Sequence, residues 1–306
     1  MRSFGPLYAA TREERAGGVV VRRIGIVNEK GGSCKTTLTV HLGAYLASKK
    51  RKRVLLVDLD PQGQLGKTLG YDVNSYSRTA LELLLDDERN PELFVRRTRF
   101  EKLDVILSNK SIALFPTLSA NDPERHLRLH RVLKRVSGYD FILMDSPANF
   151  GTTMLNIFSA ADEIVVPVNA SFLALDGCAE LVRTLSSLRT SPGVPPPELR
   201  LIVPTLYRPT RMADSVIDKL LEHFPGKVFR EPLRFDVKME EAQSHGLTVW
   251  EYAPRARSAE MLAGLGDYLL ALGPAREKGM PEEKTPLREA EVPPLAVDIR
   301  GQSREA

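Results

Sequence analysis

The stretch Ile24-Gly-Ile-Val-Asn-Glu-Lys-Gly-Gly-Ser-Cys-Lys-Thr-Thr37 decides the fold that we expect for this chain. A short apolar run leads into a glycine-containing turn, and helical periodicity follows over Thr36–Lys50. A strand, a glycine-rich turn and a helix in this order cradle phosphate groups, because backbone N–H groups and the positive end of the helix converge on the anion. The strict pattern GxxxxGK[ST] is broken twice, by Glu29 and by Cys34 in the two glycine positions.

Two further apolar runs end in carboxylates. Val54-Leu-Leu-Val-Asp58 continues to Asp60, and Phe141-Ile-Leu-Met ends at Asp145. Carboxylates at the carboxyl ends of strands lie where Mg²⁺ and an attacking water are held in nucleotide-hydrolysing sites. Each segment alone is also typical of a strand that ends in a turn-forming aspartate. The three segments together, in this order, favour a nucleotide site.

Short apolar runs that are hydrophobic on both faces recur along the chain. This pattern predicts the strands of a doubly wound α/β fold, a mostly parallel sheet flanked by helices. The predicted strands are Ile24–Asn28, Val54–Asp58, Leu103–Leu107, Phe141–Asp145, Glu163–Val168 and Leu199–Val203. We expect one domain over residues 23–273, after a flexible arm at 1–22 and before a disordered, charged, proline-rich tail at 274–306.

The composition of the chain argues against a membrane or secreted protein and against a structural zinc site. No apolar run approaches the roughly 18 residues that span a bilayer, and residues 1–23 carry charges where a secretory signal is apolar, so we expect a cytoplasmic protein without membrane attachment. Two cysteines and five histidines without paired spacing argue against structural zinc. The net charge is +4, and residues 23–273 hold 33 basic and 30 acidic residues, so bulk charge alone does not identify an anionic partner.

At these motifs the chain resembles the deviant Walker A ATPases of the ParA/Soj/MinD group, and within it the Soj-like ParA proteins of DNA segregation. Their signature KGGxGK[ST]T is similar to Lys30-Gly-Gly-Ser-Cys-Lys-Thr-Thr37 here, including an extra lysine five residues before the loop lysine. The resemblance covers about residues 23–272. It continues through Asp58–Gln64, Tyr139–Pro147, Ala161–Gly177 and Met239–Gly246.

The resemblance implies ATP and Mg²⁺ as cofactors and gives the motif residues roles. Lys35 would bind the β- and γ-phosphates, and Lys30 would reach across an ATP-dependent homodimer to the partner's γ-phosphate. Asp60 would position the attacking water. Thr36, Asp58 and Asp145 would hold the metal, with Asp145 acting through water. The implied nucleotide-binding set also includes Gly31, Gly32, Ser33, Cys34, Thr37 and Pro232.

Cys34 departs from the family pattern. The glycine that precedes the loop lysine often has positive φ, where a side chain costs roughly 1 kcal/mol or more. Three interpretations follow: the loop absorbs the strain and binds ATP normally, which we favour; nucleotide binding or turnover is weakened; or the thiol, beside Lys35 at a helix N-terminus, has a lowered pKa and is redox-sensitive.

The resemblance also implies binding to double-stranded DNA without sequence preference, through scattered basic residues. The candidates by rough alignment are Arg208, Arg211, Arg234 and Lys238. Phosphate contacts need only positive charge at suitable spacing. The alternative is that these residues are solvated or pair with Asp214, Asp218 and Glu231. A second basic cluster at 125–135 is interpreted as the solvated face of a helix, with DNA contact as its alternative.

The leading hypothesis is a nucleoid-associated DNA-partitioning ATPase whose ATP-bound sandwich dimer binds DNA and is released on hydrolysis stimulated by a ParB-like partner. One alternative is a ParA-like ATPase that positions a protein cargo. A MinD-like membrane-associated ATPase is disfavoured because the C-terminus offers proline and mixed charge instead of a basic amphipathic helix.

Overall fold

The computed structural model describes residues 20–187 and 194–275, which form a seven-stranded sheet with the order β3-β4-β2-β5-β1-β6-β7. All pairings are parallel except that of the edge strand β3 with β4. The strands are β1 (Arg22–Ile26), β2 (Val54–Asp58), β3 (Val95–Arg97), β4 (Leu103–Ile106), β5 (Phe141–Asp145), β6 (Glu163–Asn169) and β7 (Glu198–Thr205). The predicted doubly wound, mostly parallel sheet is confirmed.

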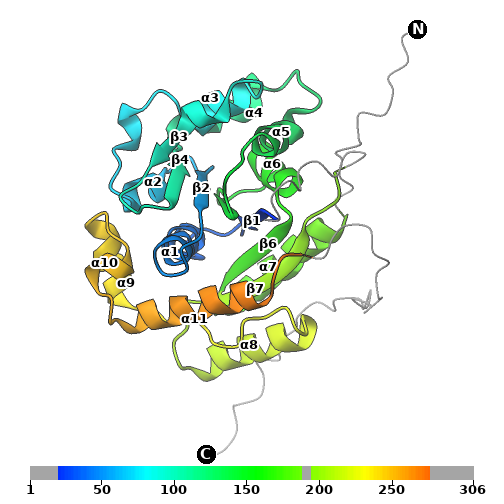
Figure 1. The fold of residues 1–306 in the computed structure, drawn as a ribbon. Coiled ribbons are helices and arrows are strands. Elements are labelled where there is room, and N and C mark those ends of the chain that lie inside the picture. Colours follow the sequence, from blue (N-terminus) through cyan, green and yellow to red (C-terminus); the bar gives the residue numbers. More distant parts are fainter. Residues whose placement is uncertain (1–19, 188–193, 276–306) are drawn as a thin grey trace, which may run out of the picture. The chain divides into compact units, whose positions relative to one another are not determined.

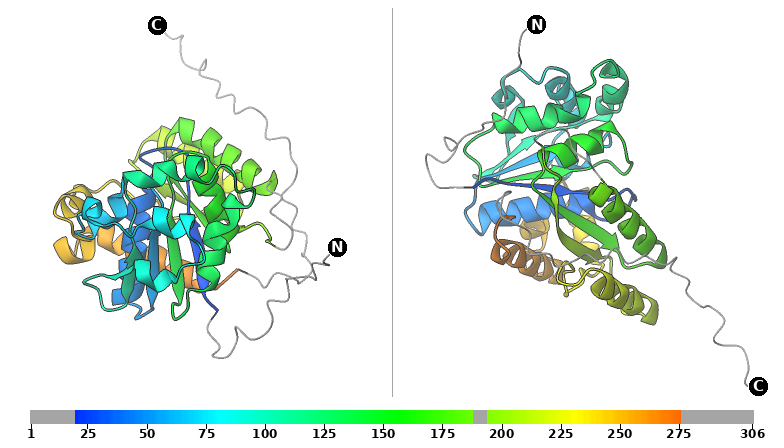
Figure 2. Two further views of the ribbon diagram at one scale, coloured as in Figure 1. Left: turned by 90° about the horizontal axis from the view of Figure 1, so that it is seen from above. Right: turned by 90° about the vertical axis from the view of Figure 1, so that its right-hand side faces the viewer.

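Helices cover both faces of the sheet. In Figure 1, α1 and α11 lie on one face and α5 and α6 on the other, and the right-hand view of Figure 2 shows the sheet between these layers. The helices are α1 (Lys35–Ser48), α2 (Gln64–Thr68), α3 (Ala80–Leu85), α4 (Phe115–Leu118), α5 (Arg128–Lys134), α6 (Thr152–Ala160), α7 (Phe172–Ser187), α8 (Arg211–His223), α9 (Val237–Ser244), α10 (Val249–Tyr252) and α11 (Arg257–Ala271).

Burial explains which strands the sequence reveals. All five residues of β2 and of β5 are buried, as continuous apolarity predicts for strands covered on both sides. The sequence analysis missed β3, whose residues Val95-Arg96-Arg97 are half-buried or exposed. A short, charged strand at a sheet edge carries no apolar run to recognise, and such charge also discourages pairing with other chains.

The sheet begins slightly earlier than predicted. Arg22, placed in the N-terminal arm by the sequence analysis, is the first residue of β1 and is buried. Its guanidinium donates two hydrogen bonds to the Glu163 carboxylate (2.7 and 2.6 Å) and one to the Leu269 carbonyl (2.9 Å). This two-point ion pair ties β1 to β6 and α11. The rest of the predicted arm to residue 19, and the predicted tail from 276, lie outside the described residues.

His41 joins α1 to α10 as a neutral imidazole. It is fully buried, and its Nε2 accepts a hydrogen bond from the Val249 N–H (3.0 Å). Its Nδ1 therefore carries the proton and donates to the Thr37 carbonyl (2.8 Å). Burial lowers the pKa of His41 to about 4, against the hydrogen bond to Thr37.

We expect this lowered pKa to reduce stability in acid. The unfolded chain binds the proton near pH 6.5 and the folded chain only near 4, so the His41 contribution is lost as pH falls through that window. The loss amounts to about 2 kcal/mol between pH 7 and pH 5. Urea unfolding of wild type and His41→Gln at both pH values measures it. The variant should lack this part of the pH dependence, and an unchanged pH dependence would contradict the assignment.

Candidate nucleotide site

Hydrogen bonds hold the turn between β1 and α1 from both sides. The Asn28 side chain donates to the Pro167 carbonyl in β6 (2.7 Å) and accepts from the Lys30 N–H (2.8 Å). On the other side, the Thr205 hydroxyl at the end of β7 donates to the Ser33 carbonyl (3.3 Å). The glycine-containing turn is thus fixed between strand ends, with Gly31 and Gly32 exposed.

Cys34 takes the left-handed conformation that its position in the motif predicts. Its φ is 70° and its ψ 25°, directly before the first residue of α1. The loop therefore accepts a Cβ where the family pattern has glycine, at a cost of about 1 kcal/mol or more. Burial raises the pKa of the Cys34 thiol, with Thr205 and Lys35 opposing the shift. This direction is opposite to the lowered pKa that we predicted for a redox-sensitive thiol, because burial outweighs the neighbouring lysine.

Lys35 points back along the loop. Its Nζ donates to the Lys30 carbonyl (3.1 Å), and its side chain is buried. Burial lowers the pKa of Lys35, while the charges of Asp145 and Asp60 act in the opposite direction. The ammonium group therefore lies near the carboxylates at the floor of the site. A phosphate chain bound there would contact it.

The deepest feature of the site is a pair of buried carboxylates. Asp58 and Asp145 face each other in the register of β2 and β5, and both are fully buried. Thr36 donates to Asp145 Oδ2 (2.6 Å) and Thr39 to Oδ1 (3.3 Å). Asp58 Oδ1 accepts from the Asp60 N–H (3.0 Å). Burial raises the pKa of both carboxyls, and the Asp145 charge raises that of Asp58 further.

One oxygen of this pair has no partner. Asp58 Oδ2 is buried and accepts no hydrogen bond among the residues that the structure describes. Two buried carboxylates and a hydroxyl are the oxygen donors that Mg²⁺ prefers, and an unsatisfied buried oxygen is costly without a cation or water. The residues predicted as the metal site, Thr36, Asp58 and Asp145, thus lie together and fit a divalent cation.

A cavity of about 550 Å³ opens over the loop. Residues 31–38 and Asp60 line one side of it. Asp60 Oδ1 accepts from the Gln62 N–H (2.7 Å), so Asp60 shapes its turn and lines the cavity at once. These are compatible functions for one side chain, as its position before Pro61 suggests.

A second part of the cavity wall comes from segments that lie far away in the sequence. It includes Leu206, residues 233–236 and Gln243 of α9. Pro232 directly precedes this wall and is not itself a lining residue. The Gln243 side chain donates to the Thr37 hydroxyl (2.9 Å), a contact that the sequence analysis missed. Gln243 lies in a segment that carried the family resemblance, but no local pattern indicates that it reaches the loop.

Lys30 lies over α7 in this structure. A Cβ added at Gly177 would come within 2.9 Å of its Cε, so a glycine on α7 leaves room for the lysine chain. Lys30 is exposed, and its contact with a second subunit stays a prediction.

Comparisons with known proteins show the family of this chain. A family model described as an AAA domain matches residues 21–194. The sporulation initiation inhibitor protein Soj of Bacillus subtilis is 34% identical over 256 residues, which cover 82% of this chain and 98% of Soj. The chromosome-partitioning ATPase Soj of Thermus thermophilus is 36% identical over 258 residues, 82% of this chain and 96% of that protein. The chain belongs to the ParA/Soj family of partitioning ATPases.

Solved structures place the same fold around nucleotides. A cobyrinic acid a,c-diamide synthase from Mycobacterium smegmatis, solved with an ATP analogue and magnesium, superposes with a TM-score of 0.71 at 28% identity, covering 82% of this chain and 94% of that one. McdA from Cyanothece, with a TM-score of 0.73 at 21% identity over 82% of this chain and 100% of that one, shares the fold. Among the described residues, no helix has the length and apolarity that crossing a bilayer requires.

Of the arginines that resemblance to ParA/Soj proteins marks for DNA, Arg234 lines the cavity and Arg208 lies just outside its lining. Tyr207 follows β7 and forms a parallel bridge with Arg234, so the segments around them run side by side. Arg208 is exposed and Arg234 half-buried, and Arg211 begins α8 with its side chain exposed. Among the described residues, none of the three has an ion pair, and Asp214 instead accepts a hydrogen bond from the Tyr207 hydroxyl (2.7 Å).

Lys238 fits the alternative more closely. It is exposed on α9, and its Nζ lies 2.7 Å from Glu241 Oε2. A phosphate would have to compete with this carboxylate, although exposed ion pairs of this kind contribute little free energy. Of the four candidates, Lys238 is thus the one with an acidic partner already in place.

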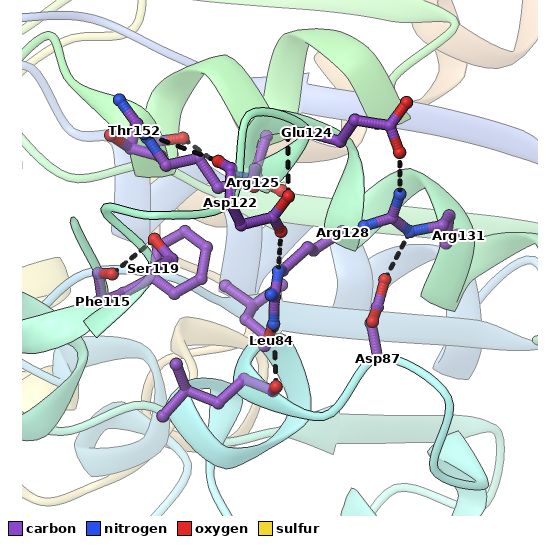
Figure 3. A network of polar contacts seen from close by, with 12 residues as sticks. Leu84, Asp87, Phe115, Ser119, Asp122, Glu124, Arg125, Arg128, Arg131 and Thr152 are labelled. Atoms are coloured by element: carbon purple, nitrogen blue, oxygen red, sulfur yellow. Dashed lines mark hydrogen bonds and ion pairs between the residues drawn. The ribbon is translucent and has the colours of Figure 1, made fainter. Parts of the chain in front are cut away.

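The second basic cluster supports the fold. Arg128 donates to Asp122 (2.8 Å) and to the carbonyls of Leu84 and Leu85 (2.9 and 2.7 Å), and Arg131 binds Asp87 and Glu124 (Figure 3). These side chains join α5 to the end of α3. The interpretation as a simply solvated helical face is wrong for these two arginines, because carboxylates and open carbonyls of neighbouring segments hold them.

We expect Cys34→Gly to bind ATP within about threefold of the wild-type affinity. The free protein already holds residue 34 at φ 70°, so the strain is present before and after binding and cancels in the affinity. Calorimetric titration of both proteins measures this. Binding tenfold tighter in the variant would show that the Cβ itself hinders the nucleotide. Cys34→Val, with a branched Cβ, should lose unfolding free energy relative to both.

Proposed function

We propose that this chain is an ATP-dependent DNA-partitioning protein. Its ATP-bound dimer binds double-stranded DNA without sequence preference, and hydrolysis stimulated by a ParB-like partner releases it. The observation that carries the proposal is that the far wall of the nucleotide cavity is built from the segments that bear Arg208 and Arg234. Relatives named as chromosome-partitioning proteins, Soj and ParA, support it.

The loop and strand ends divide the work on ATP. The amides of residues 31–36 and the Lys35 ammonium bind the phosphates, and Thr37 adds a hydroxyl whose position Gln243 fixes. Thr36, Asp58 and Asp145 would hold Mg²⁺, with Asp145 acting through water, and the ion would supply positive charge to the phosphates. Asp60, at the cavity wall, orients the attacking water.

Lys30 completes the site of a second copy. Its ammonium would meet the charge that develops on the partner's γ-phosphoryl group during hydrolysis. In the single chain the Lys30 stem lies over Gly177 instead, so dimer formation has to move it from α7. Hydrolysis is then slow in the monomer and depends on dimer formation. ATP is therefore hydrolysed in the DNA-bound dimer, which is then released.

Nucleotide binding would gate DNA binding through the shared wall. Filling the cavity fixes residues 205–206 and 233–236, and the dimer presents two copies of the adjoining arginines to one duplex. Such a protein would be associated with the nucleoid while ATP is bound. The contacts go to phosphates, so affinity depends on salt and not on sequence.

A ParA-like positioning ATPase for a protein cargo is the alternative, and it differs only in the partner. PomZ, a cell division protein of Myxococcus xanthus, is 28% identical over 250 residues, below the identity to Soj. MinD from Pyrococcus furiosus, at 23% identity and a TM-score of 0.63, shares the fold alone. Partitioning is therefore the better supported function.

We expect random-sequence duplex DNA to bind with ATP and Mg²⁺ at least tenfold more tightly than with ADP, because only the ATP-bound dimer doubles the basic surface. Fluorescence anisotropy against salt concentration measures the affinities. Arg208→Ala and Arg211→Ala should each weaken binding and lower the slope of log affinity against log salt by about 1 to 2 per dimer.

Arg131→Ala is the matched control, since it removes the same charge from a side chain that is already ion-paired. Its affinity for DNA should equal that of wild type once circular dichroism shows it folded. Equal binding in ATP and ADP would refute the proposed function. If Arg131→Ala weakens DNA binding as much as Arg208→Ala does, the DNA-binding surface includes α5.

A further inference from the structure

Two arginine–aromatic pairs alternate along the segments beside the cavity. The Arg208 Cζ lies 5.0 Å from the centroid of the Phe235 ring, and the Arg234 Cζ lies 5.4 Å from that of Tyr207. Backbone hydrogen bonds hold the two segments in register, from the Tyr207 N–H to the Leu233 carbonyl (3.0 Å) and from the Phe235 N–H to the Tyr207 carbonyl (3.4 Å). Each segment thus supplies one arginine and the ring for the other segment's arginine.

Neither ring is buried in the hydrophobic core. Phe235 is 39% exposed, so its ring face is accessible at the surface. Tyr207 is half-buried, and its hydroxyl occupies Asp214 by donating to Oδ1.

A ring face holds a guanidinium in place but accepts none of the hydrogen bonds that its N–H groups can donate. The ring attracts the cation but provides no acceptor in the plane of the five N–H donors, whereas the carboxylates and carbonyls around Arg128 take up the donors of that residue. Contact with the ring also reduces the number of side-chain conformations that are lost when a phosphate binds. Arg208 and Arg234 are therefore held in place with donors available to an anion.

We propose that Tyr207 and Phe235 are positioning residues for duplex DNA, each holding one arginine in the geometry that meets a backbone phosphate. The inference rests on the proposed function and adds to it the aromatic side chains that shape the phosphate contacts. It is specific to the ring: the Tyr207 hydroxyl is dispensable, and an aliphatic side chain of similar size does not substitute.

The first test compares Tyr207→Leu with Tyr207→Phe. Both variants lose the hydroxyl and its hydrogen bond to Asp214, and only Tyr207→Leu loses the ring. Tyr207 does not line the cavity, but Arg234, which its ring contacts, does, so ATP affinity is titrated for each variant before DNA is added. With a slowly hydrolysed ATP analogue at saturation, Tyr207→Leu should bind random duplex DNA about 5- to 30-fold more weakly, and Tyr207→Phe within about twofold of wild type.

The second test is a double-mutant cycle between Phe235→Leu and Arg208→Ala. If the ring acts through the arginine, Phe235→Leu weakens DNA binding in the wild-type background and has no further effect when Arg208 is already alanine. Phe235 lines the cavity, so each protein is first saturated with nucleotide as judged by its own titration. Phe235→Trp, which keeps an aromatic face, should restore binding.

The outcomes separate this inference from the proposed function. Wild-type DNA affinity in Tyr207→Leu, or additive effects in the cycle, would overturn the positioning role and leave ATP-gated DNA binding intact. Equal losses in Tyr207→Leu and Tyr207→Phe would overturn it as well, because the hydroxyl would then be the active group. No ATP-dependent DNA binding by wild type would refute the proposed function and this inference with it.

Discussion

Two carboxylates buried side by side are the constraint on which the site depends. Asp58 and Asp145 end neighbouring strands, and neither is exposed to water. Burying like charges together is costly unless donors and a cation accompany them. Thr36 and Thr39 of α1 offset part of this cost, but Asp58 Oδ2 has no partner among the described residues. This unpaired carboxylate oxygen lies near the glycine-containing turn, the start of α1 and Lys35.

Contacts of α1 connect the phosphate-binding turn to the segments that carry the basic residues. α1 begins at the turn and is bound to α9 and α10 through Thr37 and His41. The cavity lining also includes Arg234 and Phe235, one residue from each arginine–aromatic pair. In the proposed function, a nucleotide that fills this cavity would contact residues next to the basic surface, and this contact would link ATP binding to DNA binding.

The sequence predicts the parts of this arrangement that are local. Apolar runs that end in aspartate identify β2 and β5, and the turn before Lys35 identifies the phosphate loop, including the left-handed conformation of Cys34. It does not predict contacts made by the packing of distant segments, such as Gln243 with Thr37 or Arg208 with Phe235, since no local periodicity encodes them. For the same reason Arg128 gives a misleading signal: its charge suggests solvent, whereas its partners come from residues about forty positions away.

The Mg²⁺ dependence of ATP affinity tests most directly whether the buried carboxylate pair forms the metal site. Calorimetric titration with and without Mg²⁺ is carried out on wild type and on Asp58→Asn, which removes the unpaired charge and keeps the volume. The account predicts that Mg²⁺ raises wild-type affinity by about tenfold or more, and that the increase falls below about threefold in the variant. An equal Mg²⁺ effect in the two proteins would contradict it.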